Sequence, residues 1–236
     1  MKLKKIASLM LAGVMAVSML AGCSTASNGN DNGEGEGENG GNTATGYSAK
    51  LESYLSDEVK DMENVSFQDD AKQATALESA VKNISAAEVV KTAKENAVPN
   101  SIEDWDSPDY AKMIAELKKA YDVQDDDLQA ADMNLLWAVN EQYKANRSLN
   151  DAVVYAVTGS VDLDKALKQV ADKLNDYFKQ LPASGKVNNS EGTNPALVYD
   201  YDYTISVSVV NKPVTVFTEY DGSVNYIAVT VSRTIA

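Results

Sequence analysis

The sequence predicts an α+β fold in which a helical region, residues 47–181, precedes a small antiparallel sheet, residues 197–235. Apolar residues recur every three or four positions from Tyr47 to Leu181, which is the period of an amphipathic helix. After a stretch rich in Gly, Ser, Asn and Pro at 182–196, the period becomes two, as in a strand with one buried face. Helices followed by strands are typical of α+β domains.

Three helices are expected in the first half of this region. The first has one apolar face, formed by Tyr47, Leu51, Tyr54, Leu55, Val59 and Met62. Ser66 with Asp69 predicts the start of a second helix, whose stripe is Ala74, Leu77, Val81 and Ile84. Ser85 and Glu88 have the spacing of a capping box. They predict a third helix, which ends by Pro99.

Four more helices are expected before the sheet. Ser107 followed by Pro108 predicts a capped helix start. The acidic run 125–127 suits the positive end of the next helix, which carries Leu128, Leu135, Leu136, Val139 and Tyr143 around a buried Trp137. A short apolar helix is expected at 150–158. Ser160 is then expected to cap a last helix at 163–181, which Pro182 stops.

The C-terminal sheet is predicted to be a three-stranded antiparallel meander that packs on the helices. Its strands are expected at 198–210, 213–220 and 223–235. The turns would be Asn211-Lys212 and Asp221-Gly222, the second of which is a strong hairpin signal. This register pairs Val209 with Val214, Val207 with Val216, Val216 with Ile227, Val214 with Val229, and Tyr203 with Tyr220.

The N-terminus has the three-part layout of a secretory signal peptide. Lys2, Lys4 and Lys5 precede an uncharged apolar run at 6–20, and Ala21 and Gly22 follow. That run of fifteen residues is short for a helix that crosses about 30 Å of hydrocarbon. We therefore expect residues 1–22 to direct export and to be removed.

Residues 20–23, Leu-Ala-Gly-Cys, resemble the bacterial lipobox. The resemblance implies that the thiol of Cys23 receives a diacylglyceryl group, that cleavage occurs just before Cys23, and that fatty chains such as palmitate hold the protein at a membrane. Several acyl chains suffice for stable anchoring. The expected location is the outer face of the cytoplasmic membrane, or the outer membrane if the cell has one.

The stretch after Cys23, to residue 46, is dominated by Gly, Asn and Glu and has no large apolar side chain. Such a segment buries too little surface to offset its ordering entropy. We expect a flexible acidic linker with a reach of roughly 25–30 Å, followed by a single α+β domain, 47–236.

Composition excludes several functions. The net charge is -14, so a nucleic-acid partner is not expected, and the membrane is contacted only through lipid. The chain has no histidine, and Cys23 is its one cysteine. An intrachain disulfide and a Cys/His zinc site are therefore ruled out, and no cofactor or metal is predicted.

The most unusual segment is 199–203, where tyrosines alternate with aspartates. Tyr199, Tyr201, Asp200 and Asp202 are candidates for binding a sugar or a cation, because aromatic rings stack and carboxylates accept hydrogen bonds. The alternative is structural: the tyrosines extend the core and the aspartates face water.

A second acidic cluster comprises Glu103, Asp104, Asp106 and Asp109 around Trp105. Acids of this kind could bind calcium or act as a glycosidase pair. The cluster lacks the ligand spacing of an EF-hand loop, and helix-terminus electrostatics explain Asp106 and Asp109 more simply.

The stretch from about Leu135 to Leu181 resembles the C-terminal helices of sugar-type extracellular solute-binding lipoproteins. The resemblance is carried by residues 158–167, a capped turn that enters an amphipathic helix. The two alternating sheet domains of that family are absent, so no binding residue is carried over. The sequence favours a surface-tethered, non-catalytic module that binds carbohydrate or an envelope protein. The alternatives are an Asp/Glu glycan hydrolase and a divergent solute-binding component of a transporter.

Overall fold

The computed structural model describes residues 46–123, 145–187, 197–216 and 220–236. The chain divides into two units, residues 1–40 and residues 41–236, and every described residue belongs to the second. Cys23, the acidic run 125–127 and Trp137 lie outside the described residues. No described helix combines the length and the apolar character that a bilayer crossing requires.

The described residues form an α+β fold, as predicted. The helices are α1 (Tyr47–Tyr54), α2 (Asp57–Lys60), α3 (Ala71–Lys82), α4 (Ala86–Glu95), α5 (Pro108–Ala120) and α7 (Leu163–Lys179). The strands are β1 (Val65–Phe67), β2 (Asn100–Ser101), β3 (Leu149–Thr158), β4 (Ser184–Val187), β5 (Leu197–Val216) and β6 (Tyr220–Ile235).

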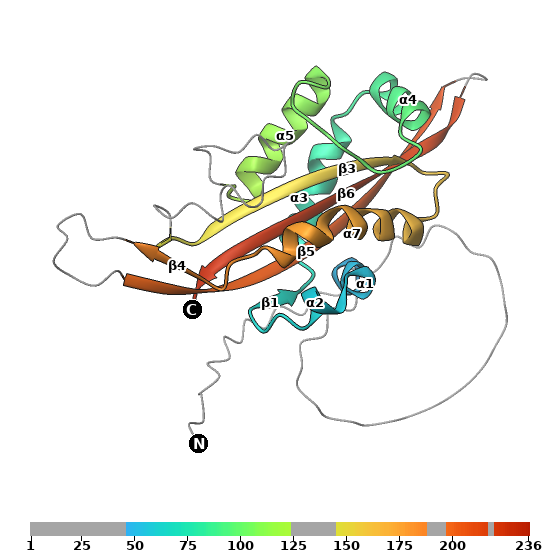
Figure 1. The fold of residues 1–236 in the computed structure, drawn as a ribbon. Coiled ribbons are helices and arrows are strands. Elements are labelled where there is room, and N and C mark those ends of the chain that lie inside the picture. Colours follow the sequence, from blue (N-terminus) through green and yellow to red (C-terminus); the bar gives the residue numbers. More distant parts are fainter. Residues whose placement is uncertain (1–45, 124–144, 188–196, 217–219) are drawn as a thin grey trace, which may run out of the picture. The chain divides into compact units, whose positions relative to one another are not determined.

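The strands form one mixed sheet in the order β1-β5-β6-β3-β2, and β4 pairs with the first residues of β5 (Figure 1). The centre of the sheet is antiparallel, because β5 pairs with β6 and β6 pairs with β3. The short strand β1 runs parallel to β5. Both β1 and β4 therefore lie on the same edge of β5, one after the other.

Helices cover both faces of the sheet, so the unit has two cores. On one face, α1, α2 and α7 pack on Ile227, Val229 and Val231 of β6. On the other face, α3, α4 and α5 pack on Val224, Tyr226 and Ala228 of the same strand. Alternate residues of β6 thus serve different cores.

The predicted meander is wrong in its register. Residues 198–210 and 213–220, expected as two strands, belong mostly to the single strand β5, and Asn211 and Lys212 lie inside it. The observed pairs are Val207 with Val229, Val209 with Ile227, Tyr203 with Arg233, Val214 with Gly222, and Val216 with Tyr220. The expected Asp221-Gly222 turn lies inside β6.

Tertiary hydrogen bonds explain why β5 continues through its polar residues. The Asn211 amide donates to Asn225 Oδ1 across the hairpin at 2.7 Å. The Lys212 ammonium donates to three main-chain oxygens at the end of α3. These side chains are satisfied without a turn, so the strand alternation persists to Val216.

The expected helical region 47–181 is interrupted by strands. Residues 65–67 form β1, so the helix expected from Ser66 begins at Ala71, where Asp70 accepts hydrogen bonds from the Lys72 and Gln73 main chain. The short helix expected at 150–158 is strand β3. Residues 151–157 are all buried, because helices cover both faces of the sheet, and a strand buried on both faces has no alternation to distinguish it from a short helix.

Several local predictions are confirmed. The Ser85 hydroxyl accepts a hydrogen bond from the Glu88 main chain, so the predicted helix start is confirmed. The reciprocal bond of a capping box is replaced, because the Ser85 main chain donates to Asp109. Ser107 caps α5 with Pro108 at its first position. The last helix is α7, but its cap is Asp162 rather than Ser160.

Candidate functional site

The alternating tyrosines and aspartates of β5 are separated by the sheet. Tyr201 and Tyr203 point into the α7 core and are 2% and 1% exposed. Tyr199 is partly buried against the same core. Asp200 and Asp202 are exposed and, by strand alternation, project from the opposite face. The four predicted binding residues therefore do not converge on one ligand site.

The buried tyrosines have structural partners at the end of the sheet. The Tyr201 hydroxyl donates to the Ala145 carbonyl and the Tyr203 hydroxyl donates to the Pro182 carbonyl, both at 2.9 Å. The guanidinium of Arg233 lies 4.3 Å from the centre of the Tyr201 ring, which is a cation–π distance. Burial raises the pKa of both tyrosines and lowers the pKa of Arg233.

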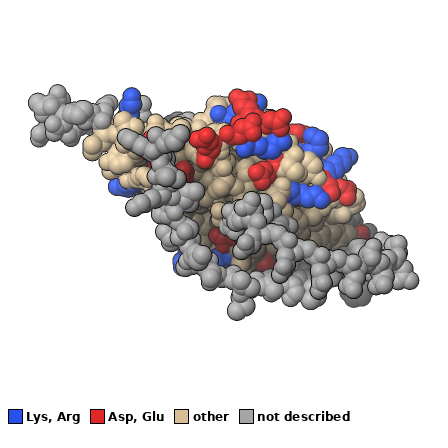
Figure 2. Space-filling view, turned by 90° about the horizontal axis from the view of Figure 1, so that it is seen from below, with Lys and Arg blue, Asp and Glu red and all other residues tan. Residues whose placement is uncertain are grey.

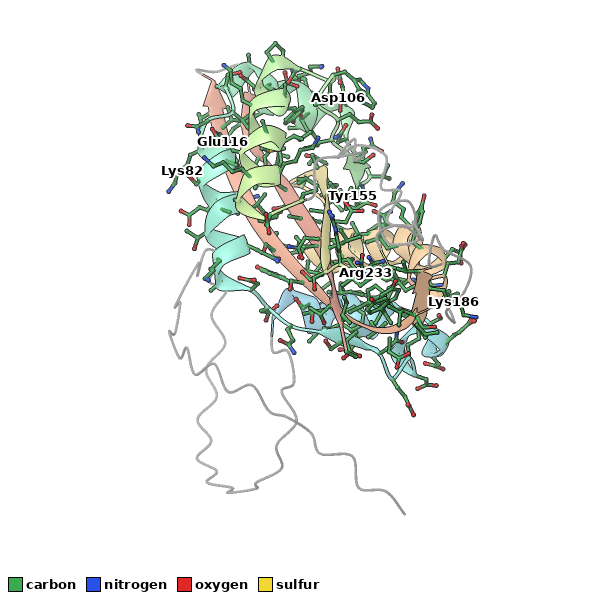
Figure 3. All side chains as sticks on the ribbon, turned by 90° about the vertical axis from the view of Figure 1, so that its left-hand side faces the viewer. Lys82, Asp106, Glu116, Tyr155, Lys186 and Arg233 are labelled. Atoms are coloured by element: carbon green, nitrogen blue, oxygen red, sulfur yellow. The ribbon has the colours of Figure 1, made fainter. Side chains whose placement is uncertain are left out.

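The aspartates belong to a part of the sheet surface that we call the open face. It comprises exposed residues of three strands: Ser184 and Lys186 of β4, Val198, Asp200 and Asp202 of β5, and Thr234 of β6. The strand register places Asp200 beside Ser184 and Asp202 beside Thr234. Carboxylates and hydroxyls thus alternate across neighbouring strands. Figure 3 shows Lys186 at the same end of the sheet as Arg233.

The open face begins where the cover by the described helices ends. Gln73, in the first turn of α3, accepts a hydrogen bond from Thr230, and beyond this point Ser232 is only partly buried and Thr234 is exposed. Charged side chains of α1, α2 and α7 are instead paired: Lys50 with Asp164 at 2.7 Å and Lys179 with Glu58 at 3.0 Å. Figure 2 shows acidic and basic side chains intermingled on the side of the molecule seen from below Figure 1.

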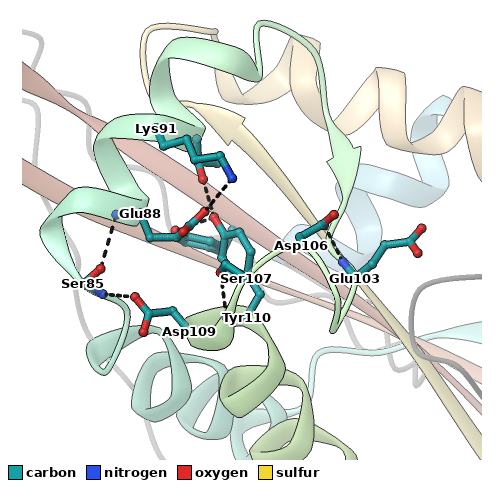
Figure 4. A network of polar contacts seen from close by, with 10 residues as sticks. Ser85, Glu88, Lys91, Glu103, Asp106, Ser107, Asp109 and Tyr110 are labelled. Atoms are coloured by element: carbon teal, nitrogen blue, oxygen red, sulfur yellow. Dashed lines mark hydrogen bonds and ion pairs between the residues drawn. The ribbon is translucent and has the colours of Figure 1, made fainter.

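Two carboxylates of the acidic cluster at 103–109 accept hydrogen bonds from main-chain N–H groups (Figure 4). Asp106 accepts a hydrogen bond from the Glu103 main chain at 2.8 Å. Asp109 accepts one from the Ser85 main chain at 2.9 Å, and hydrogen bonds from Ser85 lower the pKa of Asp109. Within the described ranges, no group of three or more Asp, Glu, His or Cys could hold a metal ion. Trp105 stands beside these acids and is 60% exposed.

A buried chain of hydroxyl groups adjoins this cluster, and sequence reasoning did not identify it. The Thr92 and Tyr110 hydroxyls are hydrogen-bonded, and the Tyr110 hydroxyl lies 3.4 Å from that of Tyr226. Glu88 lies close by and forms a 3.6 Å ion pair with Lys91. Burial raises the pKa of Tyr110 and Tyr226. These groups join α4, α5 and β6, so we assign them a structural role.

A small pocket between α5 and β3 also escaped prediction. Lys118 contributes the one charged side chain of its lining, whose other members are Ile102, Ile114, Leu117, Tyr121, Val123, Ala152 and Val154. Such an apolar lining can hold an apolar group. It offers no pair of polar groups that could act on a substrate.

Asp151 is a buried carboxyl group next to Ala152 of this lining. It is 3% exposed, and its Oδ1 accepts a hydrogen bond from the Ala152 main chain at 2.7 Å. Its Oδ2 has no hydrogen-bond partner among the described residues. Burial raises the pKa of Asp151 to about 6. The sequence signal was an acidic residue at the start of an apolar run, which was expected to form a short helix.

Asp151 predicts a pH-dependent change in stability. Because its pKa is higher in the folded state than its ordinary 3.8, its stabilisation is complete below about pH 4 and is lost as the pH rises through 6. Asp151→Asn should leave stability near pH 4 unchanged and raise the free energy of unfolding at pH 7.5 by about 2–3 kcal/mol. Urea denaturation at both pH values measures this. An identical pH dependence in Asp151→Asn and the exposed control Asp176→Asn would contradict it.

Comparison with protein-family models, curated proteins and solved structures finds no match to this chain. The site therefore has to be interpreted from its own chemistry.

Proposed function

We propose that this protein is a lipid-anchored, non-catalytic binding module of the bacterial envelope, and that it binds a hydroxyl-rich ligand such as a cell-wall glycan on its open face. Cys23 is the proposed anchor, and the acidic linker holds the domain 47–236 away from the lipid headgroups. The N-terminal charge, apolar and small-residue zones support the anchor.

The observation that carries the binding role is the exposed pair of carboxylates on the open face. Asp200 and Asp202 are two residues apart on one strand, so they lie about 6–7 Å apart. Neither forms an ion pair with a described residue, and each has an exposed hydroxyl residue on the neighbouring strand. A row of acceptors and hydroxyls of this kind can bind the hydroxyl groups of an extended sugar chain.

The use of the other acids favours binding over hydrolysis. A glycosidase needs two carboxyl groups that face one substrate, one of them with a raised pKa. Asp106 and Asp109 accept main-chain hydrogen bonds. Asp151 has the raised pKa, but it is buried within β3. The described strands also form one sheet rather than the two lobes of a solute-binding protein.

The test is glycan binding by the full chain and by the double variant Asp200→Asn/Asp202→Asn. Each lost charge-assisted hydrogen bond is worth about 1 kcal/mol or more, so the double variant should bind its glycan at least about tenfold more weakly. The readout is affinity for purified cell-wall glycan and for a glycan array.

The matched control is Asp176→Asn, which removes an exposed carboxylate from α7 and should leave binding unchanged. Equal affinity of the wild type and the double variant would contradict the assigned face. Turnover of the glycan by the wild type would contradict the non-catalytic role.

A further inference from the structure

Strand β4 has one edge that pairs with no described strand, and the geometry of this edge follows from the pairing of β4 with β5. Ala183 O accepts a hydrogen bond from Tyr201 N at 2.9 Å, and the register continues with Gly185 opposite Tyr199. In an antiparallel pair, alternate residues direct their main-chain groups toward the partner strand. The main-chain groups of Ser184 and Lys186 therefore point away from β5.

Two features that limit pairing with another strand are present, because β4 is four residues long and carries Lys186, but others are absent. No described residue hydrogen-bonds to the outward main-chain groups of Ser184 or Lys186, and both residues are exposed. Neither a proline nor a bulge interrupts residues 184–187. Proteins usually protect an edge with such devices. Beside it, Leu197 and Val198 are 59% and 56% exposed.

Two opposite charges, those of Lys186 and Asp200, lie next to this edge. A second copy related by a two-fold axis would bring each of them near the opposite charge of its partner. Lys186 lies opposite Val198, and Asp200 lies opposite the small residue Ser184. Among the described residues, neither Lys186 nor Asp200 forms an ion pair. In a single copy Lys186 lies diagonally across from Asp200 on the neighbouring strand, but the two side chains do not form an ion pair.

We propose that the outer edge of β4 pairs antiparallel with β4 of a second copy of this chain. A two-fold axis through Gly185 places Ser184 of each copy opposite Lys186 of the other, which are the residues with outward main-chain groups. Lys186 of one copy, Ser184 of the other copy and Asp200 of that other copy then lie side by side on three neighbouring strands. The main chains of Lys186 and Asp200 are therefore two strand spacings, or about 9.5–10 Å, apart. An extended lysine and an aspartate together span that distance, so two symmetric ion pairs form.

The dimer shares Ser184, Lys186 and Asp200 with the open face, but it does not require glycan binding, because sedimentation measures it without glycan. We expect it to be weak. The shared edge is four residues long, so association in solution should require high protein concentration. Two copies held on one surface by short tethers would have an effective concentration in the millimolar range. Pairing would also join two open faces into one continuous surface.

Charge-swap variants of the full chain test the register. Lys186→Glu and Asp200→Lys each place like charges together at both symmetric contacts, so each should self-associate about tenfold more weakly than the wild type. Mixed together, they restore both opposite-charge contacts and should form a heterodimer of near wild-type affinity. Asp202→Lys makes the same charge change two residues away and is the control that should still dimerise.

Sedimentation of the purified full chains, and co-capture of two differently tagged copies, measure the association. Ser184→Pro removes one outward N–H and no bond to β5, so it should abolish the dimer while thermal unfolding stays cooperative. A wild type that is monomeric up to about 1 mM would overturn the proposal. So would a charge-swap mixture that associates no better than its components, or an edge that captures a different protein in place of a second copy.

Discussion

Replacing Lys212 with methionine is expected to lower the free energy of unfolding by about 2–4 kcal/mol. The ammonium group of Lys212 donates to the carbonyl oxygens of Val81, Lys82 and Ile84 at 2.7–2.9 Å. Helix α3 ends at Lys82, so these oxygens include the unsatisfied acceptors and the negative end of its dipole. Hydrogen bonds from a charged donor are the stronger kind.

Methionine keeps the length of the side chain and removes the donors, so the loss isolates these three bonds. Burial lowers the pKa of Lys212, and the nearby Asp109 opposes that shift. Chemical denaturation measures the effect. Lys82→Met, which removes an exposed lysine paired with Glu78, should change stability by less than about 0.5 kcal/mol. A Lys212→Met variant as stable as this control would contradict the account.

Replacing Cys23 with serine is expected to abolish membrane anchoring altogether. The thiol is the one group in the chain that the lipobox resemblance assigns to lipid attachment, and serine has no thiol to form a thioether. The variant should appear as an uncleaved precursor or as protein released into the medium. Fractionation of cells and a labelled fatty acid provide the two readouts. Equal fatty-acid incorporation into wild type and variant would refute the site.

Helix starts could be predicted because their determinants are local. Ser85 and Ser107 accept hydrogen bonds from residues three positions later, so a short stretch of sequence contains the whole motif. The start of α3 was misplaced because Ser66 belongs to β1, where it pairs with Thr204 more than a hundred residues away. Local signals cannot reveal such a partner.

The sheet could be predicted only in part, because its strand period is local whereas its strand pairing depends on distant residues. The two-residue period showed that the C-terminal segment is a strand, and it showed that Tyr201 and Asp202 take opposite faces. The segment's apolar positions change from odd numbers (Val207, Val209) to an even number (Val214), and a turn at Asn211-Lys212 would place all three on one face. The continuous strand instead buries Val207 and Val214 in different cores. Lys212 decides between the turn and the continuous strand by contacting α3, which lies about 130 residues earlier in the chain.

The candidate site was also predictable only in its local features. Alternation predicts that Asp200 and Asp202 share a face, and the structure shows that this face is exposed. Helix α3 covers this face of the sheet only from Thr230 onward, and the packing of the helix sets that limit. It could not be foreseen from the residues of β5. The buried Asp151 was missed because β3 was expected to be a short apolar helix rather than a strand covered on both faces.

The account depends most on the chain leaving the cytoplasm and acquiring lipid at Cys23. Intact-mass analysis of the protein isolated from its native cells tests this directly. We predict a mature chain that begins at residue 23 and is heavier than the bare polypeptide by the mass of its acyl groups. A chain that retains residues 1–22, or one that begins at Cys23 without lipid, would contradict the account.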